Sequence, residues 1–427
     1  MMYICSECGS GHSSYYGRCP DCGTWNSLKQ FDEGGKSKGK AKTEIKSVEF
    51  FSLSKAGAAK TIRVTTGIFE VDRVLGGGLA SNAVILLAGE PGIGKSSLIL
   101  QIASGKSVLY ISGEESADQI KARAERMKID ITRMLFAGET EIQSILTGLE
   151  KQLKSFDWLV FDSIQTLYDK DIPSVYGSVS QIKEVTAKIV DFCKRNNKAA
   201  IIIGHVTKSG DIAGPKTMEH LVDVVLQFEG EKTTHFRILH AEKNRFGSTN
   251  EVGVFEMTEE GLKEAKDPTI FIGESESRIG RVVVGITEGT RPLFFEVQSL
   301  VVPTTLPVPR RVVSGYDYNK AQLLLAVLRK QLNLSFDSYD VYLTVVGGLK
   351  VRSTAADLGI CAALLSSLKN ISIPDKSVFV GEVDLLGEVR KPMYYDLLEK
   401  EAKRYGLPTI FSYSTVKTIK QLYAKLR

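Results

Sequence analysis

Short apolar runs alternate with amphipathic stretches between residues 61 and 265. Continuous apolar strands separated by helical stretches are typical of a mainly parallel sheet with helices on both faces. Such sheets bind ligands at the carboxyl ends of their strands, so polar residues there are the first candidates for function. Strands are predicted at 83–88, 108–111, 158–161, 199–203, 224–228 and 236–239, the last two as a pair.

A second region, at residues 266–427, alternates in the same way and is predicted as a further α/β unit. The whole chain has 427 residues, of which 43% are hydrophobic and 25% charged. That length allows two or three domains, each with a core of its own. The C-terminal strands are predicted at 282–286, 341–346 and 378–380, and the helices at 320–332, 355–368 and 395–405.

The net charge of +5 permits nucleic-acid binding but does not require it. No apolar run approaches the roughly 20 residues of a membrane span, and the polar N-terminus does not resemble a signal peptide. We therefore expect a cytoplasmic protein without a membrane partner, in a compartment where thiols stay reduced.

The strand predicted at 83–88 leads into a complete phosphate-binding motif, and a helix is predicted at 96–103. In the pattern G-x-x-x-x-G-K-[ST], glycines let backbone N–H groups surround phosphates, and the helix N-terminus adds its positive dipole end. Lys95 is expected to reach the β- and γ-phosphates and Ser96 to bind Mg²⁺. The chain is therefore predicted to bind ATP or GTP. The loop consists of Gly89, Glu90, Pro91, Gly92, Ile93, Gly94, Lys95, Ser96 and Ser97.

Polar residues end three other predicted strands. Asp162 suits the second Mg²⁺-associated group, the Walker B role, although an aspartate is also common there for turn reasons alone. Glu114 is interpreted as the base that orients or deprotonates the attacking water, and Glu115 as a residue that favours the dipole of the next helix. His205 suits a sensor of the γ-phosphate, with an ordinary polar strand end as the alternative.

Lys243 and Arg245 follow the last of these strands, in the string K-N-R-F-G. An arginine offers a rigid fork to a transferring phosphoryl group, so this pair suits a finger that reaches a neighbouring subunit's nucleotide. Taken alone, K-x-R is also a frequent exposed charge cluster.

Four cysteines near the N-terminus form two C-x₂-C pairs that are ten residues apart: Cys5, Cys8, Cys19 and Cys22. Four thiolates give a closed tetrahedral Zn²⁺ site of the structural type. A pair of redox dithiols is the alternative, but such motifs normally open a helix in a βαβ unit. Cys193 and Cys361 lie in apolar helical patterns and are predicted as core residues.

Aromatic and basic side chains lie in and beside this module. They suit stacking on nucleic acid, and they suit equally well a cover over the metal. The Gly- and Lys-rich stretch that follows is predicted as a flexible linker. The side chains are those of Tyr3, His12, Tyr15, Tyr16, Arg18 and Trp25.

Together these motifs resemble the bacterial RadA (Sms) family of RecA-related DNA recombination and repair ATPases. The resemblance implies an α/β fold: a RecA-like P-loop ATPase core, a small N-terminal zinc module and a C-terminal domain similar to the proteolytic domain of Lon. The implied divisions are a C4 zinc finger at 1–30, a basic linker at 31–60, the ATPase at 61–265 and an inactive Lon-like domain at 266–427. The matching segments are the four cysteines, 66–68, 72–79, 89–96, 110–116, 204–208, 212–215 and 243–247.

The family also implies a function. It implies a ring, usually a hexamer, with ATP and Mg²⁺ at subunit interfaces and with Lys243 and Arg245 acting in trans, as in DnaB-type helicases. It implies binding of single-stranded and branched DNA, cooperation with RecA, and branch migration in homologous recombination and recombinational DNA repair. A non-translocating, ATP-gated scaffold that positions RecA on DNA is the alternative.

The likeness to Lon raises ATP-dependent proteolysis as a rival function. The position that matches the nucleophilic serine of Lon holds Ala355, and the lysine would fall near Asp396 or Leu397. Without a nucleophile there is nothing to activate, so the domain is predicted as a scaffold for ring assembly and DNA contact. Phosphate contact and simple surface solvation are both open for Lys330, Lys350, Arg352, Arg390 and Lys391.

Overall fold

The structure is a computed structural model of the whole chain. It describes residues 2–5, 10–21, 23–31, 62–205, 218–230, 235–273, 278–347 and 350–427. Among the predicted features, Cys8, Cys22, the matching segment 212–215 and all of the linker except Phe31 lie outside the described residues. None of the helices in the described part of the chain is long and apolar enough to cross a membrane.

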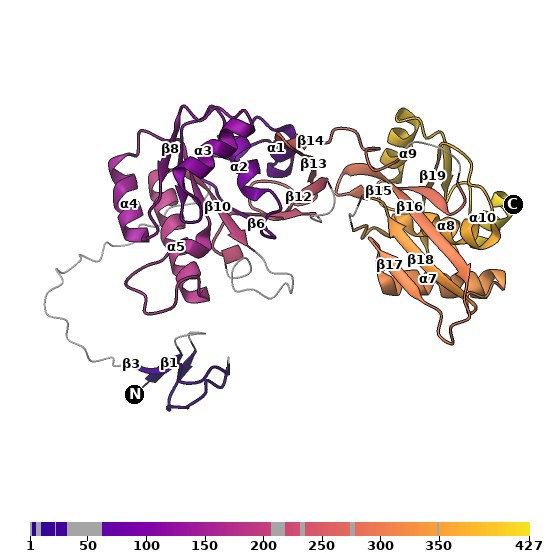
Figure 1. Cartoon of the computed structure of the whole chain (residues 1–427), viewed down its shortest axis with the longest axis horizontal. Coiled ribbons are helices and arrows are strands. Elements are labelled where there is room, and N and C mark those ends of the chain that lie inside the picture. The colour runs from indigo at the N-terminus through magenta and orange to yellow at the C-terminus, as the bar shows by residue number, and fades with distance from the viewer. Residues whose placement is uncertain are drawn as a thin grey trace, which may run out of the picture.

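The N-terminal module is a small antiparallel sheet with the order β2-β1-β3 (Figure 1). Its apolar interior is a cluster of Cys5, Cys19 and Leu28, with Tyr3 packed against it. So small a core cannot supply much stability by itself, which is the usual reason for a metal in modules of this size. The strands are β1 Met2–Cys5, β2 Gly11–His12 and β3 Leu28–Phe31.

A nine-stranded sheet forms the centre of the described residues 62–265, with the order β14-β13-β12-β11-β6-β10-β9-β7-β8. The strands from β11 to β8 are parallel, and β12, β13 and β14 extend the sheet as an antiparallel edge. This confirms the mainly parallel sheet. The strands are β6 Val84–Gly89, β7 Val108–Ser112, β8 Met134–Ala137, β9 Trp158–Asp162, β10 Ala199–His205, β11 Val224–Glu229, β12 Phe236–Asn244, β13 Val252–Thr258 and β14 Gly261–Glu264.

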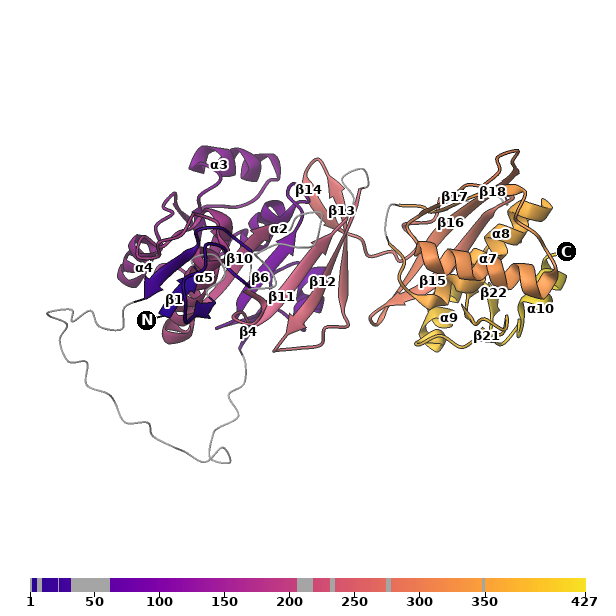
Figure 2. The same ribbon diagram turned by 90° about the horizontal axis from the view of Figure 1, so that it is seen from below.

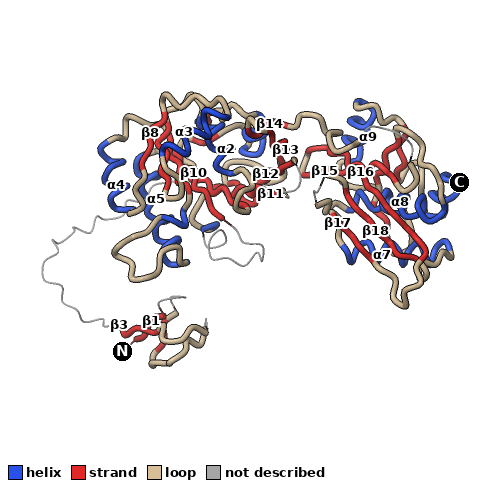
Figure 3. Tube along the Cα trace, viewed as in Figure 1, coloured by secondary structure: helices blue, strands red, loops and turns tan. Residues whose placement is uncertain are grey.

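Helices cover both faces of this sheet, because alternate side chains of each buried strand point to opposite sides. In β6, Ile85 and Leu87 join the apolar cluster under α1, α2 and α3, whereas Val84 and Leu86 join the cluster under α4 and α5. Figure 3 shows the helices on either side of the strands. Their bounds are α1 Phe69–Leu75, α2 Lys95–Ala103, α3 Ala117–Arg126, α4 Ile142–Lys151 and α5 Val179–Asn196, with short pieces β4 Arg63–Val64, β5 Leu79–Ala80 and η2 Ile164–Thr166.

The C-terminal region is built on a six-stranded mixed sheet with the order β17-β18-β16-β15-β19-β22. Helices α7, α8 and α10 pack on one face, and α9 packs on part of the other; Figure 2 shows α7 lying across the sheet. The elements are β15 Arg281–Glu288, β16 Arg291–Pro303, β17 Arg311–Ser314, α7 Tyr318–Leu332, β18 Tyr339–Val345, η3 Thr354–Ala356, α8 Asp357–Lys369, β19 Ser377–Val380, β20 Glu382–Val383, β21 Val389–Arg390, α9 Tyr395–Arg404, β22 Thr409–Ser412 and α10 Ile419–Leu426.

The two sheets are joined by buried contacts. Arg291, at the start of β16, makes an ion pair with Glu70 of α1, and both side chains are buried. Val254 of β13 belongs to the same apolar cluster as the core of the C-terminal sheet. A buried ion pair needs such well-placed partners, because removing either one leaves an uncompensated charge.

Candidate active site

The phosphate-binding loop connects β6 to α2, at the carboxyl edge of the nine-stranded sheet. Its glycines are required by space as well as by backbone angle. A Cβ on Gly89 would lie 2.5 Å from the carbonyl oxygen of Phe228, and a Cβ on Gly94, at φ +112°, would lie 2.6 Å from Cε of Met257. The loop is therefore shaped by the strands beneath it, and its backbone can approach a phosphate closely.

Lys95 is the first residue of α2, and its side chain is only 3% exposed. Its Nζ lies 2.9 Å from the carbonyl oxygens of Gly89 and Glu90 and 3.0 Å from Nδ1 of His205. Burial lowers the pKa of Lys95 to about 8, although the charges of Asp162, Glu114 and Glu90 act in the opposite direction. The loop thus holds a desolvated amine that an anionic ligand would favour in its charged form.

Asp162 ends β9 and is 3% exposed. Tyr110 of β7 donates its hydroxyl to Oδ2 of Asp162 at 2.5 Å, and the hydroxyl of Ser96 also forms a hydrogen bond with this carboxylate. Burial raises the pKa of Asp162, and both hydrogen bonds act in the opposite direction. A carboxylate and a hydroxyl side by side below the loop are the donor set that P-loop proteins use for Mg²⁺, so these residues fit that ion.

Glu114 follows β7 and contacts His205, which ends β10. The distance from Nε2 of His205 to Oε1 of Glu114 is 3.0 Å, and the hydroxyl of Ser163 donates to the same oxygen. The hydrogen bond from His205 is the largest cause of a lowered pKa of Glu114. His205 therefore bridges Lys95 and Glu114.

Glu115 makes an ion pair with Arg123 on α3, and its charge also contributes to the raised pKa of Asp162. Ser116 caps the N-terminus of that helix: its hydroxyl accepts a hydrogen bond from the N–H of Gln119, and its own N–H donates to Oε1 of Gln119. The two adjacent glutamates thus have different surroundings: Glu114 faces the loop, and Glu115 supports the helix.

The sheet register explains why these residues meet. Gly89 is paired with His205, and Ser112 with Asp162, so the carboxyl ends of β6, β10, β7 and β9 lie at one edge. Alternation of strands and helices in the sequence is enough to predict this edge.

Lys243 and Arg245 lie at the opposite edge of the same sheet. Asn244, between them, is paired with Val224, the first residue of β11, whereas Gly89 is paired with the far end of that strand. Four residues of strand separate the two levels, or roughly 13 Å. Within one subunit, Lys243 and Arg245 are therefore not placed to contact a phosphate held by Lys95.

The two cations differ in availability. Nζ of Lys243 is half-buried and donates to the carbonyl oxygens of Glu219 at 2.6 Å and Val222 at 2.9 Å. Burial is the largest cause of the lowered pKa of Lys243. The side chain of Arg245 is 59% exposed, and among the described residues it makes one long contact, 3.7 Å, with Asp223.

Sequence reasoning missed the side chains that orient the predicted ones. Tyr110 and Ser163 were not singled out, because nothing in a strand-internal tyrosine or a serine after an aspartate marks a contact across strands. Gln165 also contributes, donating to the carbonyl oxygen of His205 at 3.3 Å. Cys193 and Cys361 are confirmed as core residues: both are fully buried, and burial raises the pKa of the Cys193 thiol to about 12.

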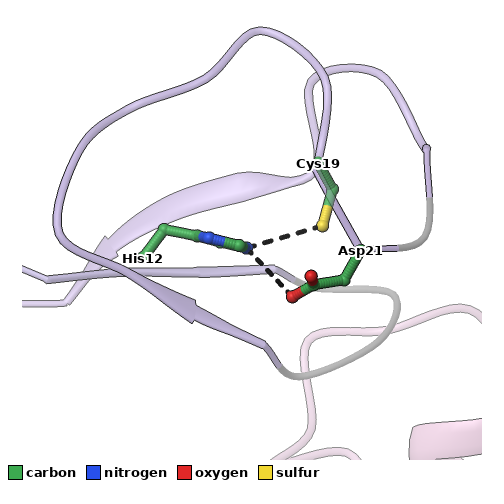
Figure 4. A group of neighbouring side chains, drawn as sticks. All are labelled: His12, Cys19 and Asp21. Atoms are coloured by element: carbon green, nitrogen blue, oxygen red, sulfur yellow. Dashed lines mark hydrogen bonds and ion pairs between the residues drawn. The ribbon is translucent and has the colours of Figure 1, made fainter.

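In the N-terminal module, Cys5 and Cys19 are both buried in one cluster, as a shared metal requires. Sγ of Cys5 lies 3.2 Å from Oγ of Ser27. Figure 4 shows His12 beside the second thiol, with Nε2 3.7 Å from Sγ of Cys19 and 3.5 Å from Oδ2 of Asp21. The described thiols therefore fit a zinc site, and His12 with Asp21 adds polar groups at its side that spacing did not predict.

The aromatic side chains of this module face outward. Trp25 is 69% exposed and Tyr15 and Tyr16 are about half exposed, while the guanidinium of Arg18 lies 5.9 Å from the centre of the Trp25 ring. Within the described residues of the module, Tyr3 packs against the buried cysteines and His12 lies beside Cys19. Of the two interpretations, the exposed positions favour a surface that binds a partner over a cover for the metal.

In the C-terminal region, the position that matches the serine of Lon holds the buried Ala355, and Asp396 is exposed and paired with Lys391. Among the five basic residues named as phosphate contacts, Arg352, Arg390 and Lys391 make ion pairs with acidic side chains.

Comparison with known proteins agrees with this architecture. The family model of the ATPase KaiC matches residues 64–268, and that of the rubredoxin metal binding domain matches residues 3–30. The nine-stranded region is thus a RecA-like ATPase with a zinc ribbon before it. Among solved structures, that of the RadB recombinase covers 47% of the chain at 22% identity, with a TM-score of 0.38.

Over nearly its whole length the chain is similar to curated DNA repair proteins. The RadA protein of Aquifex aeolicus is 45% identical over 410 residues, which cover 95% of this chain and 91% of that protein. The RadA protein of Rickettsia bellii is 43% identical over 417 residues, covering 96% and 92%. The chain belongs to the RadA family of DNA repair proteins.

Proposed function

We propose that the chain is a DNA-dependent ATPase and branch-migration helicase that processes recombination intermediates together with RecA. The observation that carries this proposal is the division of the candidate catalytic groups between two edges of one sheet. Lys95, Glu114 and Asp162 lie at the carboxyl edge, and Arg245 lies at the other. A site that needs both halves is complete only when two subunits meet, as in a ring.

Each residue of the carboxyl edge has a role in this proposal. The backbone of Gly89–Ser97 and the ammonium of Lys95 hold the phosphates of ATP, and Ser96 with Asp162 holds Mg²⁺, which neutralises charge on the phosphoryl groups when bound. Glu114 accepts a proton from the attacking water. His205, which contacts both Lys95 and Glu114, changes partner when a γ-phosphate occupies the loop and so serves as its sensor.

Arg245 is the group that we assign to the neighbouring subunit's nucleotide. Its exposed side chain and the long contact with Asp223 leave it able to reorient, whereas Lys243 donates to the carbonyl groups of the segment before β11. An arginine supplied in trans can be decisive for the rate of phosphoryl transfer. A ring of subunits, usually a hexamer in the family, places the two halves together.

A loop after β9 is suited to contact single-stranded DNA. At its tip, Val175 and Tyr176 are 77% and 66% exposed, and the ring of Tyr168 lies 4.3 Å from that of Tyr176. The buried amide of Gln181 fixes the loop through hydrogen bonds to Asp169. Exposed, pre-positioned aromatic rings are what bases stack on.

In the other regions, Cys5, Cys8, Cys19 and Cys22 hold a structural Zn²⁺. The C-terminal region serves as a scaffold rather than a protease, because the position that would hold the nucleophilic serine holds Ala355, which cannot act as a nucleophile. The predicted boundaries, at 30, 60 and 265, are part of this proposal.

The test is the ATPase rate of the purified chain with and without single-stranded DNA, followed by branch migration of a synthetic three-strand junction. We expect DNA to stimulate ATP hydrolysis and the junction to be resolved only with ATP, and Lys95→Ala to abolish both activities. Stimulation without junction movement would favour the ATP-gated scaffold that positions RecA. An ATPase rate that single-stranded DNA does not change would refute the proposed DNA-dependent motor.

The trans assignment is tested by mixing two inactive variants. Lys95→Ala subunits keep Arg245, and Arg245→Ala subunits keep the loop, so mixed rings contain some complete sites. We expect partial recovery of ATP hydrolysis in the mixture. If each variant and the mixture are equally inactive, Arg245 does not act across the interface.

A further inference from the structure

Arg237 is a buried cation on β12 that lies directly below the phosphate-binding loop. Arg237 is only 4% exposed, and its Nε donates to the carbonyl oxygen of Ile93 at 3.1 Å. Its Nη1 donates to the carbonyl oxygen of Phe236 at 2.7 Å. A buried guanidinium is costly to desolvate, so a structure that keeps one at this place holds it by specific hydrogen bonds.

The hydrogen bond to Ile93 fixes the direction of the next N–H. A peptide group is planar and trans, so its C=O and N–H point in opposite directions. With the carbonyl of Ile93 turned down to Arg237, the N–H of Gly94 is turned away from the sheet, toward the interior of the loop. Backbone N–H groups with this direction are what bind phosphate oxygens in such loops.

The strands under the loop leave little freedom for this peptide to rotate. Gly94 has φ +112°, and Cε of Met257 on β13 occupies the space where a side chain on Gly94 would lie. Gly230 packs against Arg237 so closely that a Cβ there would be 2.6 Å from Cδ of the arginine. The arginine is thus held between β11, β12 and the loop.

The other side of Arg237 leads to the C-terminal region. Phe236 meets the ring of Phe271 edge-on at 4.6 Å, and Phe271 stacks on Phe295 of β16 at 4.6 Å. Neighbouring residues of β12 therefore contact the loop and the second sheet. These ring contacts hold β12, the strand that carries Arg237, in position between the loop and the second sheet.

We propose that Arg237 is a positioning residue of the nucleotide site, which sets the direction of the Gly94 N–H toward the phosphates. The inference rests on the proposed nucleotide site, and it is independent of whether the chain moves DNA. Loss of an oriented N–H to a charged phosphate weakens binding by about 1.5–3 kcal/mol, or roughly 10- to 100-fold in Kd.

The experiment measures the Kd of a fluorescent ATP analogue for the full chain and for Arg237→Met, Arg237→Lys and Arg281→Met. We expect Arg237→Met to weaken binding by roughly 10- to 100-fold. Arg237→Lys should recover much of the loss, because an ammonium can donate one hydrogen bond to the Ile93 carbonyl. Arg281→Met removes a partly buried arginine of the C-terminal sheet, paired with Glu296 at 2.9 Å, and should leave the Kd unchanged.

Thermal unfolding without nucleotide separates positioning from support of the fold. If Arg237→Met lowers the melting temperature no more than Arg281→Met does and yet loses affinity, the assignment holds. The assignment is overturned if Arg237→Met binds as the unaltered chain does, or if Arg237→Lys melts normally and still binds as weakly as Arg237→Met. Failure of the unaltered chain to bind the analogue would refute the proposed nucleotide site itself.

Discussion

Two buried charged clusters, one in each large sheet, use the same kinds of side chain in different ways. Around the phosphate-binding loop lie Lys95, Asp162 and Tyr110; in the C-terminal region lie Lys320, Asp357 and Tyr316. In the second cluster Asp357 accepts hydrogen bonds from the Tyr316 hydroxyl at 2.6 Å, and Nζ of Lys320 lies 3.0 Å from its other oxygen.

The difference lies in the counter-ion of the lysine. Lys320 is paired with the carboxylate of Asp357. Lys95 is more deeply buried, and within the described residues no carboxylate lies within ion-pair distance of its Nζ. Its contacts are two carbonyl oxygens and a histidine, and the carboxylates of Asp162, Glu114 and Glu90 act on it from farther away. A buried ammonium without a counter-ion indicates an anionic ligand, whereas a buried ammonium with one indicates a structural contact.

The largest effect on ATP hydrolysis is expected for Glu114→Gln, which removes a carboxylate from the nucleotide-site cluster. The amide keeps the size of the side chain but cannot accept a proton from water. We expect the rate of ATP hydrolysis to fall by about 10²- to 10⁴-fold while the Kd for ATP changes little. Steady-state hydrolysis and nucleotide titration on the same preparation measure the two quantities.

Glu115→Gln is the matched control, because it makes the same chemical change one residue away. Its carboxylate pairs with Arg123, whereas that of Glu114 contacts His205. A small change in rate is expected. Equal losses in the two variants would remove the distinction between the adjacent glutamates.

The second prediction concerns the C-terminal cluster of Lys320, Asp357 and Tyr316. Asp357→Ala leaves the hydroxyl of Tyr316 and the partly buried ammonium of Lys320 without their acceptor, so the free energy of unfolding of the C-terminal region should fall by about 1–3 kcal/mol. The ATPase site lies in the other sheet, so the Kd for ATP should not change. Hydrogen exchange of the C-terminal peptides at increasing urea concentrations, followed by mass spectrometry, measures the stability of this region.

Asp396→Ala provides the comparison, since this aspartate is exposed and makes a surface ion pair with Lys391. A change of at most about 1 kcal/mol is expected. If Asp357→Ala is as mild as Asp396→Ala, Asp357 does not stabilise the fold through Tyr316 and Lys320.

The sequence predicts the nucleotide edge well and the C-terminal contacts poorly, and the reason is the range of the contacts involved. The loop residues are contiguous, and Glu114, Asp162 and His205 each follow an apolar run, so local pattern places them at one edge. Arg237 and Tyr110 face the site from within strands, and Asp357 meets Tyr316 across 41 residues. Such pairings depend on register, which apolar alternation alone does not fix.

The same limit applies to strands of the second sheet. The longest, β16 at Arg291–Pro303, was not predicted, since polar Glu296 and Gln298 interrupt its apolar run on the face away from α7 and α8. Glu296 is nevertheless buried, because Arg281 pairs with it. A pattern of apolar and polar positions assigns charged residues to the surface. It therefore does not predict a buried ion pair between strands.

The smallest expected effect is a dependence of nucleotide binding on pH. Burial lowers the pKa of Lys95 to about 8, and bound phosphates favour the ammonium, so binding above pH 8 takes up a proton. Below that pH the lysine is charged in both the free and the bound protein, and the affinity is constant. From pH 8 to 9 the Kd for ADP should rise by up to about tenfold.

The folding stability of the free protein changes with pH in the opposite direction. An unfolded lysine stays protonated up to its ordinary pKa of 10.5, so the buried lysine destabilises the fold less as pH rises above 8. Calorimetry at pH 8.5 in two buffers of different ionisation heat measures the proton uptake directly, and Lys95→Arg, which does not titrate there, should show none. Equal uptake by the arginine variant would assign the proton to another group and would remove the contrast between Lys95 and Lys320.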